Sequence, residues 1–221
     1  MQKGKKDKNN INLILGSSSE RRKMLFSMLF ERFEIIEPSC QEIIFKNPVK
    51  TVLENSKLKM LSILKNEDIK KNLYNEDKSL NNNENIFITA DTIVYRNHKI
   101  FPKPKSKEDA FLMLKELNGK KHLVYTGVCI YCKNKFIFFY EKTKVYFNFF
   151  SDNLLKNYIN TLEPLDAAGA YKIQGAGSIL IKKVEGSITN VIGFPVEKFL
   201  KYYNRFICYS KEEVTIVSTT Y

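Results

Sequence analysis

The fold is decided in the stretch Leu13-Ile-Leu-Gly-Ser17-Ser-Ser-Glu-Arg21-Arg22-Lys-Met-Leu25, where an apolar strand runs through a hydroxyl-rich turn into a helix. Ser19 has the side chain of a helix N-cap, and Glu20 suits the helix dipole. The two arginines of the first turn oppose that dipole by about 0.3–1 kcal/mol each. A bound anion would remove this conflict. We therefore expect backbone N–H groups, serine hydroxyls and guanidinium groups to converge on phosphate there.

Strands and helices are intermixed on either side of this stretch. Apolar runs predict strands over 11–15, 33–38, 86–95, 98–101, 124–131, 135–140, 143–150 and 179–184. Helical spacing of apolar residues predicts helices over 19–33, 49–64, 106–118, 152–161 and 195–206. This order is typical of an α/β fold with a mixed twisted sheet and flanking helices, and not of a strict βαβ series.

Composition and charge set the class of protein. The chain has 221 residues, of which 43% are hydrophobic and 27% charged, with a net charge of +12. The charge favours anionic partners, but a solvated basic surface explains it better than a nucleic-acid patch. No apolar run has membrane-spanning length, and residues 11–15 are too short for the core of a signal peptide, so we expect a cytoplasmic protein without membrane contact.

The folded domain is predicted to span residues 11–204, with a terminal segment on either side and one insertion within it. Residues 1–10 have the composition of a disordered basic tail, and residues 66–85 form a low-complexity insertion rich in Asn, Lys and Glu. Residues 205–221 form a C-terminal extension.

The cysteine pattern argues against a metal centre of the zinc type. Cys129 and Cys132 have a redox or metal spacing, but residues three apart on a strand face opposite sides. The chain has no second such pair and only two histidines, His98 and His122. We expect reduced thiols in or near the core.

Asp91 is the first candidate for chemistry, because it lies within the apolar run Ile86–Tyr95. A buried, unpaired carboxylate costs several kcal/mol or takes a raised pKa, so an Asp kept there usually faces a cation, a metal or a proton-transfer task. Lys57, Lys103 and Glu42 each have an ordinary interpretation as a solvated or loop side chain. Together with Asp91 they provide the cations and paired carboxylates that phosphoryl transfer needs.

A second candidate segment is Glu163-Pro-Leu-Asp-Ala-Ala-Gly-Ala-Tyr-Lys-Ile-Gln174-Gly175. It is too polar for a core and too rich in small residues for a helix. The Gln174 amide both donates and accepts, which suits the edge of a base, although a surface Gln on a structural loop is the alternative. Walker-type, dinucleotide-binding and zinc-protease motifs are all missing from the sequence, and no serine triad is supported.

These segments, in this order, resemble the Maf family of nucleotide pyrophosphatases over residues 12–202. The matching pieces are LILGSSSxRR from Leu13, Glu42, Lys57, Ala90-Asp91-Thr92, Lys103-Pro104, Asp109-Ala110-x-x-Met113-Leu114, Tyr125-Thr-Gly-Val128, the Glu163–Gly175 segment, Glu185-Gly186 and Asn190-Val-x-Gly-x-Pro195. The resemblance implies two lobes around a central cleft. It also implies hydrolysis of a nucleoside triphosphate to the monophosphate and pyrophosphate, helped by magnesium or manganese.

The resemblance also implies roles for single residues. Asp91 matches the family's catalytic acidic residue, proposed as general base. Arg21, Thr92 and Gln174 match specificity positions and resemble the branch acting on dTTP and UTP, as against 7-methyl-GTP or CTP. We expect the site residues other than Thr92 and Gln174 to bind either the phosphates or the metal ion. The expected phosphate ligands are Ser17, Arg21, Arg22, Lys57 and Lys103, and the expected metal ligands are Glu42 and Asp91.

The sequence leaves two alternative functions open. A non-catalytic regulator that binds nucleotides or nucleic acid would use the net charge of +12, but it has no need of a carboxylate among its phosphate contacts. A kinase-like phosphotransferase would need nucleotide-binding loops that are missing here. A homodimer is compatible with the sequence.

Overall fold

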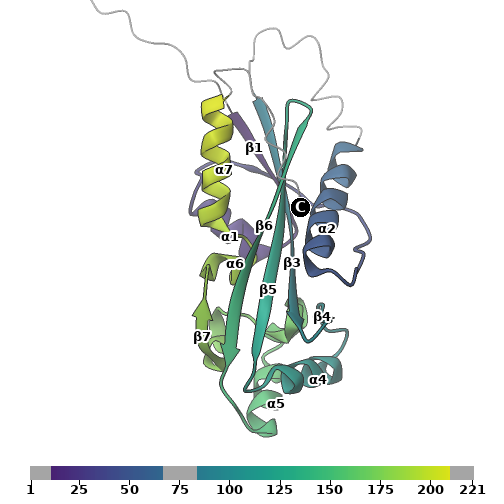
Figure 1. Cartoon of the computed structure of the whole chain (residues 1–221), viewed down its shortest axis with the longest axis vertical. Coiled ribbons are helices and arrows are strands. Elements are labelled where there is room, and N and C mark those ends of the chain that lie inside the picture. Colours follow the sequence, from purple (N-terminus) through teal and green to yellow (C-terminus); the bar gives the residue numbers. More distant parts are fainter. Residues whose placement is uncertain (1–10, 67–83, 210–221) are drawn as a thin grey trace, which may run out of the picture.

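The computed structural model describes residues 11–66 and 84–209 (Figure 1). The predicted basic tail, nearly all of the predicted insertion and residues 210–221 of the extension lie outside these ranges.

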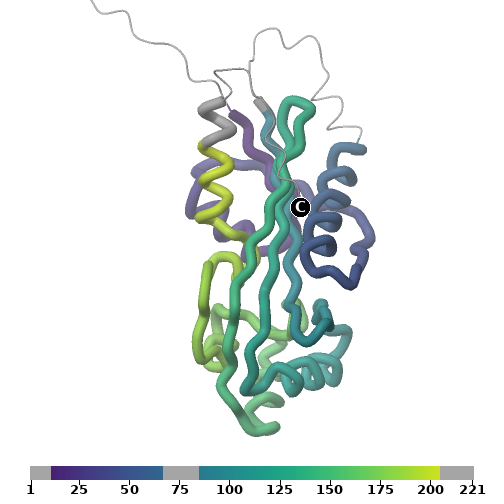
Figure 2. The backbone as a smooth tube through the Cα atoms, in the orientation of Figure 1, coloured from purple at the N-terminus to yellow at the C-terminus, as the bar shows by residue number. Residues whose placement is uncertain are grey.

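The described strands form one mixed, seven-stranded sheet. They are β1 (Ile11–Gly16), β2 (Glu34–Ile36), β3 (Glu84–Arg96), β4 (Lys99–Phe101), β5 (Lys121–Cys132), β6 (Lys135–Phe147) and β7 (Ile181–Glu185). Their order is β2-β1-β3-β5-β6-β7, and β4 pairs with the far end of β3. β1 is parallel to β2 and β3, whereas the other pairs are antiparallel. Figure 2 shows β3, β5 and β6 running the length of the molecule.

Helices cover both faces of the sheet and its lower end (Figure 1). They are α1 (Glu20–Ser27), α2 (Pro48–Leu64), α4 (Lys107–Leu117), α5 (Asp152–Asn160), α6 (Ile188–Ile192) and α7 (Val196–Tyr209). α2 lies on one face, and α1 and α7 lie on the other. Short 3-10 turns at Glu163–Asp166, Ala168–Ala170 and Gly175–Leu180 join α5 to β7. The mixed α/β fold is therefore confirmed.

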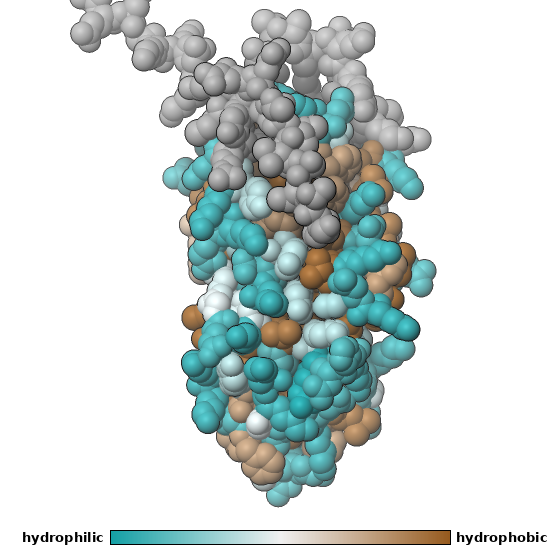
Figure 3. Space-filling view, viewed as in Figure 1, coloured by the Kyte–Doolittle hydropathy of each residue, from teal (hydrophilic) through white to brown (hydrophobic). Residues whose placement is uncertain are grey.

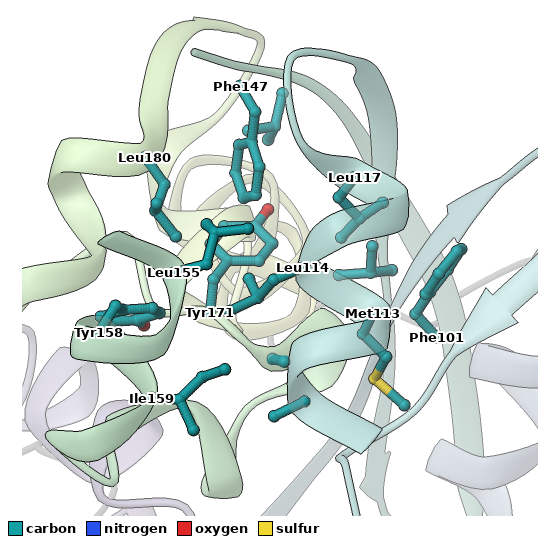
Figure 4. Close-up of a cluster of buried hydrophobic side chains, with 14 of the residues drawn as sticks. Phe101, Met113, Leu114, Leu117, Phe147, Leu155, Tyr158, Ile159, Tyr171 and Leu180 are labelled. Carbon is teal, nitrogen blue, oxygen red and sulfur yellow. The ribbon is translucent and has the colours of Figure 1, made fainter. Parts of the chain in front are cut away.

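The hydrophobic core is divided between the two ends of the long strands. At the upper end, Phe26 of α1 packs against Phe194 and Phe199 with ring centroids 4.9 and 5.7 Å apart. At the lower end, α4 and α5 enclose a second cluster, in which Leu114 and Tyr171 lie side by side (Figure 4). Polar side chains cover most of the face seen in Figure 3. The fold therefore has an upper and a lower lobe that share one sheet.

Two sequence predictions about element bounds were wrong. The helix expected to run to about residue 33 ends at Ser27, because the chain turns there and lets Phe30 and Phe33 pack back on Phe26. The runs 135–140 and 143–150 are one strand, β6, up to Phe147, because its register with β5 is continuous from Lys135 to Tyr146.

Candidate active site

The candidate site lies at a gap in the sheet beside β3. β1 ends at Gly16, opposite Thr89, whereas β4 pairs with β3 only from Val94 onward. Between these points the described part of the chain places no strand on that side of β3. A cavity of about 270 Å³ opens there. The polar side chains that line it are Ser17, Ser18, Ser19, Arg21, Arg22, Glu42, Thr51, Asn55, Lys59, Asp91, Thr92, Lys103 and Lys172.

The gap lets two neighbouring residues of β3 serve the cavity from opposite faces of the sheet. Side chains alternate along a strand, so Asp91 points toward α2 and Thr92 points toward α1. If another strand paired with β3 at this point, the sheet would separate the side chain of Asp91 on one face from that of Thr92 on the other. At the open edge both line the same cavity.

A glycine brings α2 close to Asp91. Gly127 is the direct partner of Asp91 on β5, and a Cβ at Gly127 would lie 2.5 Å from the carbonyl oxygen of Val52 in α2. No real side chain is tolerated at that distance, so only glycine lets the backbone of α2 approach the sheet there. This approach carries the polar side chains of α2 to the carboxylate.

Asp91 is buried and has a different partner for each oxygen. Lys59 Nζ lies 2.6 Å from Oδ1, and Asn55 Nδ2 donates to Oδ2 at 3.1 Å. Lys59 Nζ also lies 2.7 Å from Oε1 of Glu42, which is more exposed. The two carboxylates therefore converge on one ammonium group, and Asp91 is buried beside a cation, which is one of the three alternatives that the sequence left open.

The serine turn is shaped by Ser17 rather than by the expected cap. Ser19 is the N-cap residue by position, but its side chain makes no capping bond. Instead, the backbone N–H of Ser19 donates to Oγ of the buried Ser17 at 3.1 Å. This bond fixes the turn between β1 and α1 at the edge of the cavity.

The two adjacent arginines take different positions. Arg22 is buried, and it donates from Nε to the carbonyl of Gly193 at 2.8 Å and from Nη2 to Oγ1 of Thr92 at 3.0 Å. Arg21 donates from Nη2 to the carbonyl of Asp166 at 3.0 Å, and its Nη1 is buried without a partner. Burial lowers the pKa of both arginines. Both guanidinium groups therefore stand to gain from an anion in the cavity.

Lys103 lines the cavity at its solvent-exposed mouth. Its Nζ lies 2.6 Å from Oδ1 of Asp166, and both side chains are largely exposed. Burial raises the pKa of Asp166, but the hydrogen bond and charge of Lys103 lower it by more, so the net shift of this pKa is downward. The carboxylate stays charged and holds Lys103 at the mouth of the cavity.

The structure does not bring Lys57 or Gln174 to the cavity wall. Lys57 is exposed on α2 and is not among the lining residues. The amide of Gln174 donates to the sulfur of Met24 at 3.7 Å, at the edge of α1. Seven of the predicted site residues do line the cavity. They are Ser17, Arg21, Arg22, Glu42, Asp91, Thr92 and Lys103.

The sequence reasoning missed two residues of α2 that contact Asp91, Asn55 and Lys59. They are four positions apart and lie on the buried stripe of that helix, between Val52 and Ile63. Polar residues that interrupt a buried stripe need a partner across the interface, and this signal could have identified them. Lys57 is rotated by about 200° from Lys59 around the helix.

Glu42 and Asp91 provide two carboxylates, which suits a magnesium ion that is also bound by substrate phosphates. They do not suffice for a site in which the protein supplies every ligand. Within residues 11–66 and 84–209, no three or more His, Cys, Asp or Glu side chains gather as a metal site. Mg²⁺ is usually bound by one or two carboxylates together with substrate phosphates. Cys129 and Cys132 face opposite sides of β5 in separate clusters, so they do not form a joint site.

Comparisons with known proteins identify relatives over most of the chain. Residues 12–206 match the family model described as "Maf-like protein". The chain is 44% identical to the dTTP/UTP pyrophosphatase of Thermosipho melanesiensis, over 85% of this chain and 94% of the relative. It is 39% identical to the dTTP/UTP pyrophosphatase of Clostridium tetani, with the same shares covered. None of the described helices is both long and apolar enough to cross a membrane.

Proposed function

The chain belongs to the Maf-like family, and on that premise we propose that it hydrolyses dTTP and UTP to the monophosphate and pyrophosphate. The relatives named above support a nucleoside triphosphate pyrophosphatase, a hydrolase acting on acid anhydrides. The observation that carries the proposal is Asp91, a buried carboxylate held at both oxygens beside a cavity rich in cations. A protein that only binds nucleotides gains nothing from such a group.

The upper end of the cavity suits the triphosphate. The turn at Ser17 and the start of α1 present hydrogen-bond donors, and Arg21, Arg22 and Lys59 add positive charge. Lys103 stands at the mouth, where a phosphate would displace Asp166 from its ammonium. We propose Lys59 for the role that the sequence reasoning gave to Lys57.

Asp91 then orients or deprotonates the water that attacks phosphorus. Asn55 holds Oδ2 of Asp91, so this carboxylate stays in place when the ammonium of Lys59 turns from Oδ1 to an entering phosphate. Glu42 and Asp91 would hold a divalent cation, magnesium or manganese, which supplies positive charge to the phosphate oxygens. Positioning and charge are the main demands of phosphoryl transfer, and the described side chains provide both.

The base would be selected by contacts around Arg21 and Gln174. Thr92 acts differently, because its hydroxyl already contacts Arg22 at 3.0 Å and Thr126 at 2.9 Å. A hydroxyl has one donor and two acceptor sites, so few remain for a base. We propose that Thr92 contributes to specificity by holding Arg22 in place.

The test is pyrophosphate release from dTTP, UTP, CTP, GTP and 7-methyl-GTP by the purified chain with Mg²⁺. We expect preference for dTTP and UTP, and a loss of about 10²–10⁴-fold in Asp91→Asn, the range of a general base. Asp152→Asn is the matched control, because Asp152 lies on α5 in an exposed ion pair with Lys115.

Three outcomes would contradict the proposal in different ways. Full activity in Asp91→Asn would remove Asp91 from the mechanism. A preference for 7-methyl-GTP or CTP would overturn the choice of branch. Salt-sensitive binding of RNA or DNA, with no turnover of any triphosphate, would favour a non-catalytic regulator.

A further inference from the structure

Asn55 is a buried polar side chain of the cavity that the proposed chemistry does not itself require. It lies on α2 with only 2% of its surface exposed. A buried amide without hydrogen bonds is costly, so its partners reveal what the side chain does. Both ends of the amide are satisfied, and each faces a different part of the site.

The two hydrogen bonds of Asn55 connect the elements that carry the two carboxylates. Nδ2 donates to Oδ2 of Asp91 on β3 at 3.1 Å. Oδ1 accepts the backbone N–H of Ile43, the residue directly after Glu42, at 2.9 Å. One rigid side chain thus ties the loop of Glu42 to the carboxylate of Asp91.

We propose that Asn55 is a positioning residue that fixes Asp91 and the Glu42 loop relative to each other, an inference that rests on the proposed function. Lys59 makes the same connection through charge, because it contacts both carboxylates. Its ammonium is also a ligand for phosphate, so that connection weakens when substrate enters. The neutral amide of Asn55 has no such competing partner and keeps Asp91 in one orientation.

Thr51 separates the two parts of this role. It lies one turn before Asn55 on α2 and is equally buried. Its Oγ1 accepts the backbone N–H of Phe45 at 3.0 Å, so it anchors the same loop without contacting Asp91. A change at Thr51 therefore loosens the loop alone, whereas a change at Asn55 also frees the carboxylate.

The experiment measures kcat and KM for UTP in wild type, Asn55→Asp, Asn55→Leu and Thr51→Val. Asn55→Asp keeps an acceptor for Ile43 but loses the donor to Asp91, and Asn55→Leu loses both at similar volume. We expect kcat to fall by about 10- to 100-fold in both Asn55 variants, with KM within about threefold, because misplacing a reacting group costs this much. We expect a smaller fall in kcat for Thr51→Val than for either Asn55 variant, because that change loosens the loop of Glu42 but leaves the hydrogen bond to Asp91 in place.

The outcomes distinguish this inference from the proposed function. Wild-type kcat in Asn55→Asp, or an equal loss in Thr51→Val, would overturn the positioning role while leaving the pyrophosphatase intact. A wild type that turns over no triphosphate would contradict the function instead. In that event a crystal structure of Asn55→Leu decides: a rotated Asp91 carboxylate supports the inference, and an unchanged one overturns it.

Discussion

Lys59 and Lys103 both line the cavity, and each forms an ion pair with an N–O distance of 2.6 Å, yet the two pairs lie in opposite surroundings. In the pair of Lys59 and Asp91 the side chains are 13% and 5% exposed, whereas in the pair of Lys103 and Asp166 they are 62% and 63% exposed. Water and salt weaken the exposed pair, while the buried pair keeps its strength and its desolvation cost. Burial, and not distance, decides what each pair does.

The difference divides the cavity into a fixed end and an adjustable end. At the buried end, Asp91 is held by Lys59 and Asn55, so its position is set before substrate arrives. At the mouth, Lys103 exchanges Asp166 for a phosphate at little cost, because both side chains are already solvated. Chemistry needs the first property, and substrate entry needs the second.

The largest effect is expected from Lys59→Met, which breaks the buried pair. Removing one partner leaves Asp91 charged and buried, and this costs about 3–5 kcal/mol of the free energy of unfolding. Turnover of UTP should fall by at least about 10²-fold, because Asp91 and the phosphates lose a cation. Urea unfolding in EDTA measures the first effect, and pyrophosphate release measures the second.

Lys57→Met is the matched control for that variant. Lys57 is exposed on the same helix and does not line the cavity, so we expect stability within about 0.5 kcal/mol and near wild-type turnover. If Lys57→Met lost turnover and Lys59→Met kept it, the fixed end of the cavity would be misassigned.

The next largest effect concerns a buried pair of uncharged side chains, His122 and Tyr171, and tests how burial affects stability at low pH. His122 is buried beside Tyr171, and a hydrogen bond of 2.8 Å joins Nε2 to the hydroxyl. Burial lowers the pKa of His122 to about 3. An unfolded His titrates near 6.5, so between about pH 6.5 and 3 the unfolded state binds the extra proton. Stability is therefore lost as the pH falls, by about 2–3 kcal/mol from this group at pH 4.5.

His122→Gln isolates this contribution, because an amide forms hydrogen bonds without titrating. The stability difference between wild type and variant should change by about 2–3 kcal/mol between pH 7 and pH 4.5 in favour of the variant. His98→Gln is the control for the substitution itself, since His98 is the other histidine of the chain and is exposed. An equal pH dependence in wild type and His122→Gln would show that His122 titrates normally.

The sequence predicted the residues whose environment is local and missed those whose environment is tertiary. Asp91 was found because its own strand is apolar, and this needs no knowledge of neighbours. The sequence prediction named Lys57 and not Lys59. Helical spacing could have placed Lys59 on the buried face of the helix, but its partner is known only from the approach of α2 to the sheet at Gly127. The role of Asn55 likewise depends on β3 and the Glu42 loop meeting at one helix.

The bounds of β6 show the same limit for the fold. Residues 141–142 interrupt the apolar run, so the sequence predicted two strands around them. The structure continues through Glu141 and Lys142, because both pair with β5 and their side chains remain partly exposed. Backbone pairing with a long neighbour thus overrides a polar break in the pattern.

The smallest effect is expected from Lys103→Met, which breaks the exposed pair. Folding stability should change by less than about 1 kcal/mol, because solvent-exposed ion pairs contribute little. KM for UTP should rise by about 5- to 10-fold, since a solvated ammonium still attracts phosphate. High salt should shrink this ratio, because it screens exposed charges, and should leave the effect of Lys59→Met nearly unchanged.

Lys105→Met is the control for the exposed pair, because Lys105 is also exposed, lies two residues after Lys103 and does not line the cavity. A salt-independent loss in Lys103→Met would mean that the mouth is as closed to solvent as the buried end.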